Sequence, residues 1–136
     1  MPERKTIERA RKDKREGNAP STQAGEFVRE EMEHIREGKH GARSTKQAIA
    51  IGLSKARRAG VKLKPPKRGQ ASARTRKSAA RAYRAGQSGS RRKPSVKRSR
   101  ATLRALKREP HRAASKKALS AQARRAAARR RHRASA

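Results

Sequence analysis

Residues 38–57 read GKHGARSTKQAIAIGLSKAR, and this stretch decides the fold because a turn with two glycines leads directly into an amphipathic helix. Ser44 and Gln47 have the spacing of a capping box, in which two side chains satisfy backbone N–H groups at the start of a helix. We predict that this helix ends just before Gly60, a residue type that commonly terminates helices. Gly52 lies on its apolar side, where the lack of a side chain permits close approach of a second helix.

The segment before the turn, residues 21–38, predicts the second helix of a pair. Its apolar residues recur at helical spacing, with Phe27 at the edge of the stripe, and its remaining surface is rich in glutamate. Glu31 falls between Phe27 and the stripe, so it is either a carboxylate at the rim or the partner of a base on the next helix. Two amphipathic helices joined by a short glycine turn predict an αα-hairpin over residues 21–64.

The segments on either side of the hairpin are highly charged. Residues 1–20 predict a short charged helix, with Thr6 as its N-cap, and a break. Pro65 and Pro66 end the hairpin module because the residue before a proline is disfavoured in helices. Residues 65–136 are rich in Lys, Arg and Ala and have few large apolar side chains, which is typical of disorder in the free state and of helix formation on a partner. The expected fold class is therefore all-α, a hairpin with a charged N-terminal helix and a long disordered basic tail.

Charge is distributed unevenly along the chain. Residues 1–37 hold nine Lys/Arg and nine Asp/Glu, whereas residues 38–136 hold thirty-three Lys/Arg and one acid, Glu109, so they carry the whole net charge of +32. A segment with this density of positive charge repels itself and requires a polyanion. DNA, RNA and anionic membranes are the abundant candidates.

The bases of the tail recur at helical spacing, which would place them in stripes along helices that form between Pro66, Pro94 and Pro110. Such stripes can reach phosphates in or across a groove of nucleic acid. The expected nucleic-acid contacts from the hairpin and the tail are Lys46, Lys55, Arg57, Arg58, Arg74, Lys77, Arg81, Arg84, Arg100, Arg104, Lys107, Arg108, Arg125, Arg129 and Arg133.

Composition also helps to distinguish among these candidate partners. Tyr83 is the sole aromatic after residue 37, which argues against base-stacking modules for single strands. Few apolar anchors accompany the bases, which argues against a membrane. Duplex DNA is favoured, bound with little sequence preference by a non-enzymatic, histone-like protein that coats or condenses it. An RNA- or ribosome-associated protein is the alternative, as is an adaptor whose acidic helix recruits a protein partner. The helical hairpin is also a candidate surface for a protein partner or a homodimer.

The sequence lacks the residues that several other classes of function require. The chain has no cysteine, no phosphate-binding glycine loop and no paired acids after residue 37, so we expect no enzyme and no cofactor. His34, His40, Glu30 and Glu37 are interpreted as solvated polar side chains and not as a metal site. No apolar run is long enough for a signal peptide or a membrane span, which predicts a cytoplasmic protein at the nucleoid.

The quoted stretch, residues 38–57, also resembles the hallmark of a family of small, basic bacterial proteins of unknown function. Members pair this segment with an upstream Glu-rich helix and often with a basic tail, and the resemblance covers about residues 1–68. It implies a bacterial origin and a common module without an assigned activity. The tail is similar in composition alone to those of linker histones and bacterial histone-like proteins.

Overall fold

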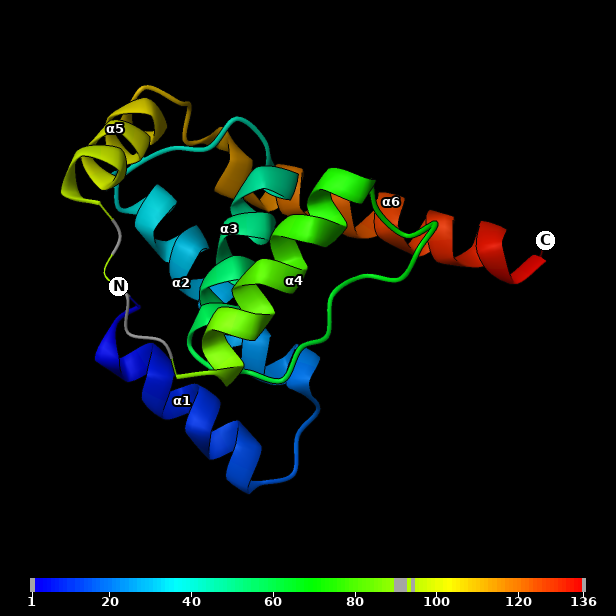
Figure 1. The fold of residues 1–136 in the computed structure, drawn as a ribbon. Coiled ribbons are helices and arrows are strands. Elements are labelled where there is room, and N and C mark those ends of the chain that lie inside the picture. The colour runs from blue at the N-terminus through cyan, green and yellow to red at the C-terminus, as the bar shows by residue number, and fades with distance from the viewer. Residues whose placement is uncertain (1, 90–92, 94, 136) are drawn as a thin grey trace. The chain divides into compact units, whose positions relative to one another are not determined.

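The computed structural model describes residues 2–89, 93 and 95–135, and these form only helices and their connections. The elements are α1 (Arg4–Arg15), α2 (Pro20–Arg36), α3 (Thr45–Arg58), α4 (Ala73–Gln87), α5 (Val96–Lys107), the 3₁₀ helix η1 (Arg112–Ala114) and α6 (Lys116–Ser135) (Figure 1). The expected all-α class is confirmed.

The chain divides into two compact units whose segments alternate along the sequence. The first comprises residues 1–31 and 49–94, and the second residues 32–48 and 95–136. Helices α2 and α3 therefore contribute to both units, and the turn between them belongs to the second.

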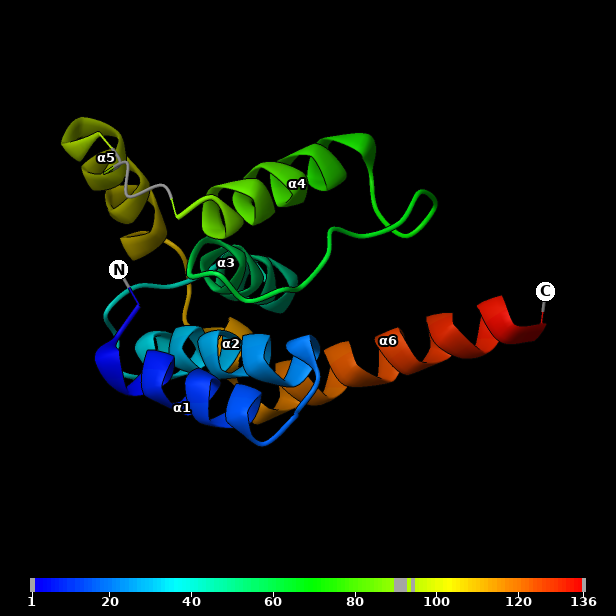
Figure 2. The same cartoon turned by 60° about the horizontal axis from the view of Figure 1, so that its bottom comes forward.

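The first unit has a small apolar core. Figure 2 shows α1 running alongside α2. The buried side chains come from α1, α2, α3 and the segment after α3, and they are Ala10, Ala24, Phe27, Ala56 and Val61, with Ile7, Leu53 and Leu63 packed around them. Because most of these residues are small, the backbones must approach closely to exclude water.

Gly52 creates the closest of these approaches. A Cβ atom at this position would lie 2.7 Å from the Cα atom of Val28, so α3 crosses α2 at a point where only glycine fits. The close helix approach expected at Gly52 is confirmed. Gly60, expected to end the helix, follows the last turn of α3 with a φ of +99°, in the region that favours glycine.

The glutamates of α2 hold α1 in place. The fully buried carboxylate of Glu30 accepts hydrogen bonds from the backbone N–H of Glu3, at 2.5 Å, and from the Thr6 hydroxyl, at 3.2 Å. The Arg9 guanidinium donates to Glu26 Oε2 at 2.7 Å. The prediction that Thr6 caps this helix is wrong, because α1 begins at Arg4 and Thr6 lies inside it.

The prediction that residues 65–136 form a long disordered tail is also wrong. This region contains α4, α5, η1 and α6. Serine side chains accept backbone N–H bonds at the starts of its three α-helices: Ser72 from Thr75, Ser95 from Arg98 and Ser115 from Ala118. The prediction gave charge repulsion and the lack of large apolar residues more weight than the high helix propensity of Ala, Arg and Lys, and it did not consider these caps.

Within the second unit, backbone carbonyls fix the region after Pro94 to the turn that precedes α3. Four donors of residues 36–45 bind carbonyls of residues 106–114, namely Arg36 Nε to Ala114, Gly41 N to Leu106, Ala42 N to Pro110 and Thr45 Oγ1 to Ala113, at 2.5–3.0 Å. A Cβ atom at Gly41 would lie 1.9 Å from the carbonyl oxygen of Glu109. Hydrogen bonds to main-chain carbonyls thus hold residues 106–114 in place, in a region that has few large apolar side chains to bury.

Replacement of Gly52 by Ala is expected to lower the free energy of unfolding by about 1–3 kcal/mol, because the new methyl group meets the backbone of Val28. Gly25→Ala is the matched control on α2, where nothing lies within 4 Å. It should raise stability by about 1 kcal/mol through helix propensity. Urea unfolding measures both, and equal effects of the two substitutions would contradict the close crossing.

Thr45→Val is expected to lower the free energy of unfolding by about 1–3 kcal/mol, because it leaves the buried Ala113 carbonyl without its donor. Thr45→Ser keeps the hydroxyl and is the control. Amide hydrogen exchange at Ala114 and Ser115 should accelerate in the valine variant alone. Unchanged exchange there would show that Thr45 does not anchor this region.

Candidate nucleic-acid interface

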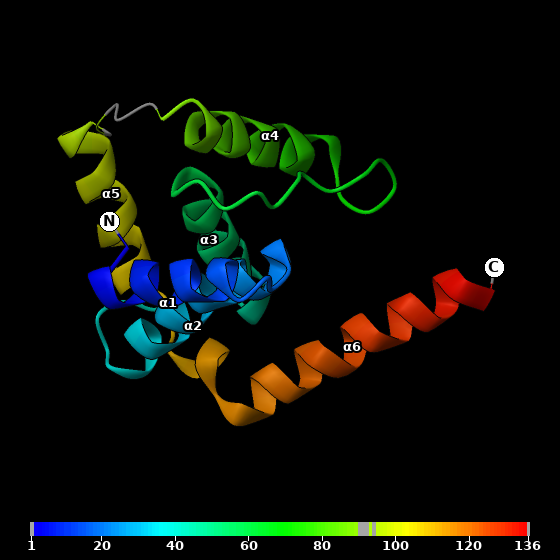
Figure 3. The same ribbon diagram turned by 90° about the horizontal axis from the view of Figure 1, so that it is seen from below.

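Helix α4 presents a cationic stripe opposite a buried face. The stripe is the expected one, and all its members are exposed: Arg74, Lys77, Arg81 and Arg84. Ala79 and Ala82 point the other way and are buried. Figure 3 shows α4 beside α3. A Cβ atom at Gly86 would lie 1.8 Å from the Arg57 carbonyl oxygen, so α4 is held against the end of α3 with its bases toward solvent.

Helix α5 carries the second expected stripe, and none of its residues is buried. Its bases Arg100, Arg104 and Lys107 line an open hollow together with Leu103, which is 44 % exposed. Arg108, the residue after the helix, is exposed as well. Three cations around an open hollow form a surface that suits an anionic group.

Helix α6 is the longest helix of the described residues, with 20 residues and none of them buried. It packs at its start against η1, whose Ala113 and Ala114 are buried. The expected stripe of Arg125, Arg129 and Arg133 is exposed along its length. In Figure 1 it is a single straight helix.

The expected bases of α3 have two different environments. Lys46 and Arg58 are exposed. Lys55 forms an ion pair with Glu31, whose side chain is only 1 % exposed, so the interpretation of Glu31 as the partner of a base on the next helix is confirmed. This ion pair gives the Lys55 side chain a partner within the fold.

The Arg57 side chain also has its hydrogen-bond partners within the fold. It is buried, and its guanidinium donates to the carbonyls of Leu63 and Lys64 at 3.1 and 3.3 Å. Loss of surrounding water lowers the pKa of Arg57 below its ordinary value. Helical periodicity placed Lys55 and Arg57 with the other bases but could not show these internal partners, which occupy both side chains within the fold.

One set of bases was missed by the sequence reasoning. Lys117, Arg124 and Arg131 lie on α6 and are exposed. Their spacing of seven residues places them on one side of the helix, apart from the stripe that begins at Arg125. That spacing was the available signal, since it is visible in the sequence.

Carboxylates compensate charge in the first part of the chain and hardly at all in the rest. Arg4–Glu8, Lys12–Glu16 and Lys39–Glu37 are exposed ion pairs, which contribute little to stability. Glu109 is the only Asp or Glu after residue 37. The bases of α4, α5 and α6 therefore have almost no acidic side chains to neutralise them.

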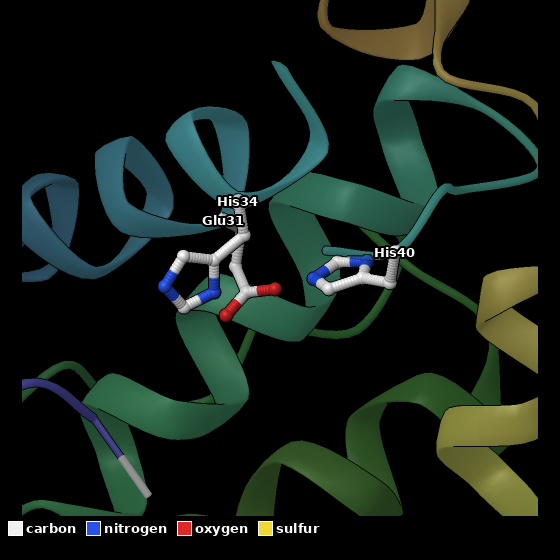
Figure 4. A group of neighbouring side chains, drawn as sticks. All are labelled: Glu31, His34 and His40. Atoms are coloured by element: carbon white, nitrogen blue, oxygen red, sulfur yellow. The ribbon is translucent and has the colours of Figure 1, made fainter. Parts of the chain in front are cut away.

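Two histidines in the second unit have a defined arrangement. The rings of His34 and His40 meet edge to face with centroids 6.0 Å apart, and His40 Nδ1 lies 2.8 Å from the Gly41 carbonyl oxygen. Figure 4 shows His34 on α2, one turn after Glu31, and His40 in the turn that follows the helix. Glu31 belongs to the first unit and is already paired with Lys55. The expectation that Glu30 and His40 are solvated is wrong, because their exposed fractions are 0 % and 7 %. We assign no metal ion to these side chains.

None of the helices in the described part of the chain combines the length and the apolar character that crossing a membrane requires.

Comparison with known proteins places the first half of the chain. Residues 3–68 match the model of DUF6496, a family of unknown function. The match confirms the resemblance drawn from residues 38–57, and it covers α1, α2, α3 and the segment up to Arg68. No curated protein and no solved structure matches the chain. In this chain the DUF6496 region includes the donors at residues 36–45 that hold residues 106–114.

Substitution of Lys55 by Met should destabilise the fold because it leaves the buried Glu31 carboxylate without its cation. Glu31→Gln removes the charge that needs a partner. In a double-mutant cycle, the two substitutions together should cost less than the sum of the single ones, with a coupling energy of about 1–2 kcal/mol. Thermal and urea unfolding supply the four values, and strict additivity would contradict an ion pair that stabilises the fold.

Proposed function

We propose that this chain is a non-enzymatic protein that binds duplex DNA with little sequence preference and coats or condenses it at the nucleoid, in the cytoplasm. The observation that carries the proposal is the exposure of cationic stripes on α4, α5 and α6 in a region whose only acid is Glu109. Lys46 and Arg58 of α3 are further exposed bases. Acidic side chains of the same region cannot neutralise these bases, because Glu109 is the only one. The phosphate backbone of DNA can, since it supplies one negative charge about every 1.7 Å of duplex.

The binding would be electrostatic in origin. Each phosphate that a Lys or Arg neutralises releases condensed counterions, and this release supplies affinity that is independent of base sequence. Each stripe lies on a helix, so its bases reach the duplex from a fixed backbone. Like-charged neighbours at i,i+4, such as Arg125 and Arg129, each destabilise a helix by about 0.2–0.5 kcal/mol. Phosphates that neutralise them would remove this cost, so DNA binding should stabilise α6.

Structured RNA is the second candidate because it offers the same phosphate charge. An adaptor role is a further alternative for the acidic helix α2. Several of its glutamates, however, bind α1 and α3: Glu26 binds Arg9, Glu30 binds Thr6 and Glu31 binds Lys55. These contacts give the acids a role within the fold, which favours the nucleic-acid proposal over a protein partner for α2.

Neutralisation of the α4 stripe tests the proposal. Replacement of Arg74, Lys77, Arg81 and Arg84 by Gln should weaken binding to a mixed-sequence duplex and reduce the slope of log K against log salt by about 0.9 for each phosphate that the variant no longer neutralises. The matched control replaces four exposed bases of α1, Arg11, Lys12, Lys14 and Arg15, by Gln. Both variants lose the same charge, but the α1 bases lie among the acids of the first 37 residues.

Fluorescence anisotropy over a series of salt concentrations measures the slopes. The control should retain most of the wild-type slope, and circular dichroism should show that both variants keep their helices. If the two variants bind DNA equally well, the bases of α4 are not a phosphate-binding surface. If the wild-type protein does not bind duplex DNA, the proposed function is wrong.

A further inference from the structure

Six of the eight exposed Lys/Arg of helix α6 form two rows on different sides, and the other two, Lys116 and Arg130, lie on the side away from Ala128. One row is Lys117, Arg124 and Arg131, and the other is Arg125, Arg129 and Arg133, with all six side chains exposed. Since each residue turns an α-helix by about 100°, the centres of the two rows are about 140° apart around the axis. The rows therefore face away from each other and cannot lie flat against a single line of phosphates.

The surface between the two rows consists mainly of small side chains. It contains Ala121 and Ala128, with His132 near the end of the helix. Ala128 and His132 are exposed, and Ala121 is partly exposed. A helix with this cross-section has a low floor between two positively charged edges.

The major groove of B-form DNA complements this cross-section. The groove is about 12 Å wide and admits an α-helix, and phosphates line both of its edges. A helix that enters with Ala128 toward the base pairs would direct one row of bases to each strand's phosphates. Alanine side chains let the helix approach the base edges and offer no hydrogen bonds to them, in keeping with a lack of sequence preference.

We propose that α6 binds in the major groove of B-form duplex DNA, with its two rows of bases on the phosphates of opposite strands. The inference rests on the proposed function and assigns the partner of α6 more narrowly, since the deep and narrow major groove of A-form RNA does not admit side chains in this way. His132 lies at the groove floor in this arrangement.

The test places one bulky residue at the groove floor or on the far side of the helix. Ala128 and Ala123 are both exposed alanines of α6, and they lie on roughly opposite sides of it. Ala128→Trp should weaken binding to a short unmodified duplex about tenfold, equivalent to about 1.4 kcal/mol, by holding the helix out of the groove. Ala123→Trp should bind like the wild type. Because the chain has no tryptophan, each variant also carries a single fluorophore, and duplex DNA should change the emission of A128W alone.

A second arm uses the wild-type protein with a duplex in which cytosines carry glucosylated hydroxymethyl groups, which fill the major groove. This duplex should bind more weakly than the unmodified one. Equal affinities of A128W and A123W, or of the two duplexes, would overturn the groove arrangement while wild-type binding still supported the proposed function. Absence of wild-type binding to any duplex would instead refute the proposed function. Circular dichroism establishes that both variants keep their helices.

Discussion

The structure depends on the confinement of nine of its ten acidic residues to residues 1–37. Those carboxylates are used within the fold: Glu26 and Glu30 hold α1 against α2, and Glu31 holds Lys55 of α3. The glutamates thereby help to assemble a core whose own side chains are mostly small. Downstream of them, the bases of α4, α5 and α6 have almost no acidic residues among them, and the proposed function rests on these exposed cationic helices.

Main-chain hydrogen bonds and close backbone approaches hold parts of residues 65–136 in place. Donors from Arg36 to Thr45 bind carbonyls of residues 106–114, and the glycines at positions 41 and 86 let backbones touch where a side chain would collide. These contacts fix short segments and leave the long helical faces exposed. A region built in this way can keep its bases in register without burying large apolar residues.

Much of the local structure was predictable. Helical periodicity, the capping spacing of Ser44 and the glycine at position 52 predicted α2, α3 and their close crossing, and Ser44 Oγ does accept the backbone N–H of Gln47. The helices of residues 65–136 were readable from the propensity of Ala, Arg and Lys and from their serine caps. The contacts that hold residues 106–114 were not predictable, because they depend on carbonyl acceptors that every residue possesses. The same limit applies to Arg57: its helical position is readable, but its carbonyl partners at Leu63 and Lys64 follow from the path of the chain after Gly60.

The exposed helices α4, α5 and α6 differ in how they are anchored but share uncompensated charge, and the polyanion that we propose as their partner is duplex DNA. Competition at physiological salt tests this claim most directly. Labelled duplex DNA bound to the full chain is displaced by unlabelled duplex DNA, by duplex RNA of the same sequence or by anionic lipid vesicles, each added at equal charge concentration. The account predicts that duplex DNA displaces the label at the lowest concentration. Displacement by RNA or by vesicles at an equal or lower concentration would contradict it.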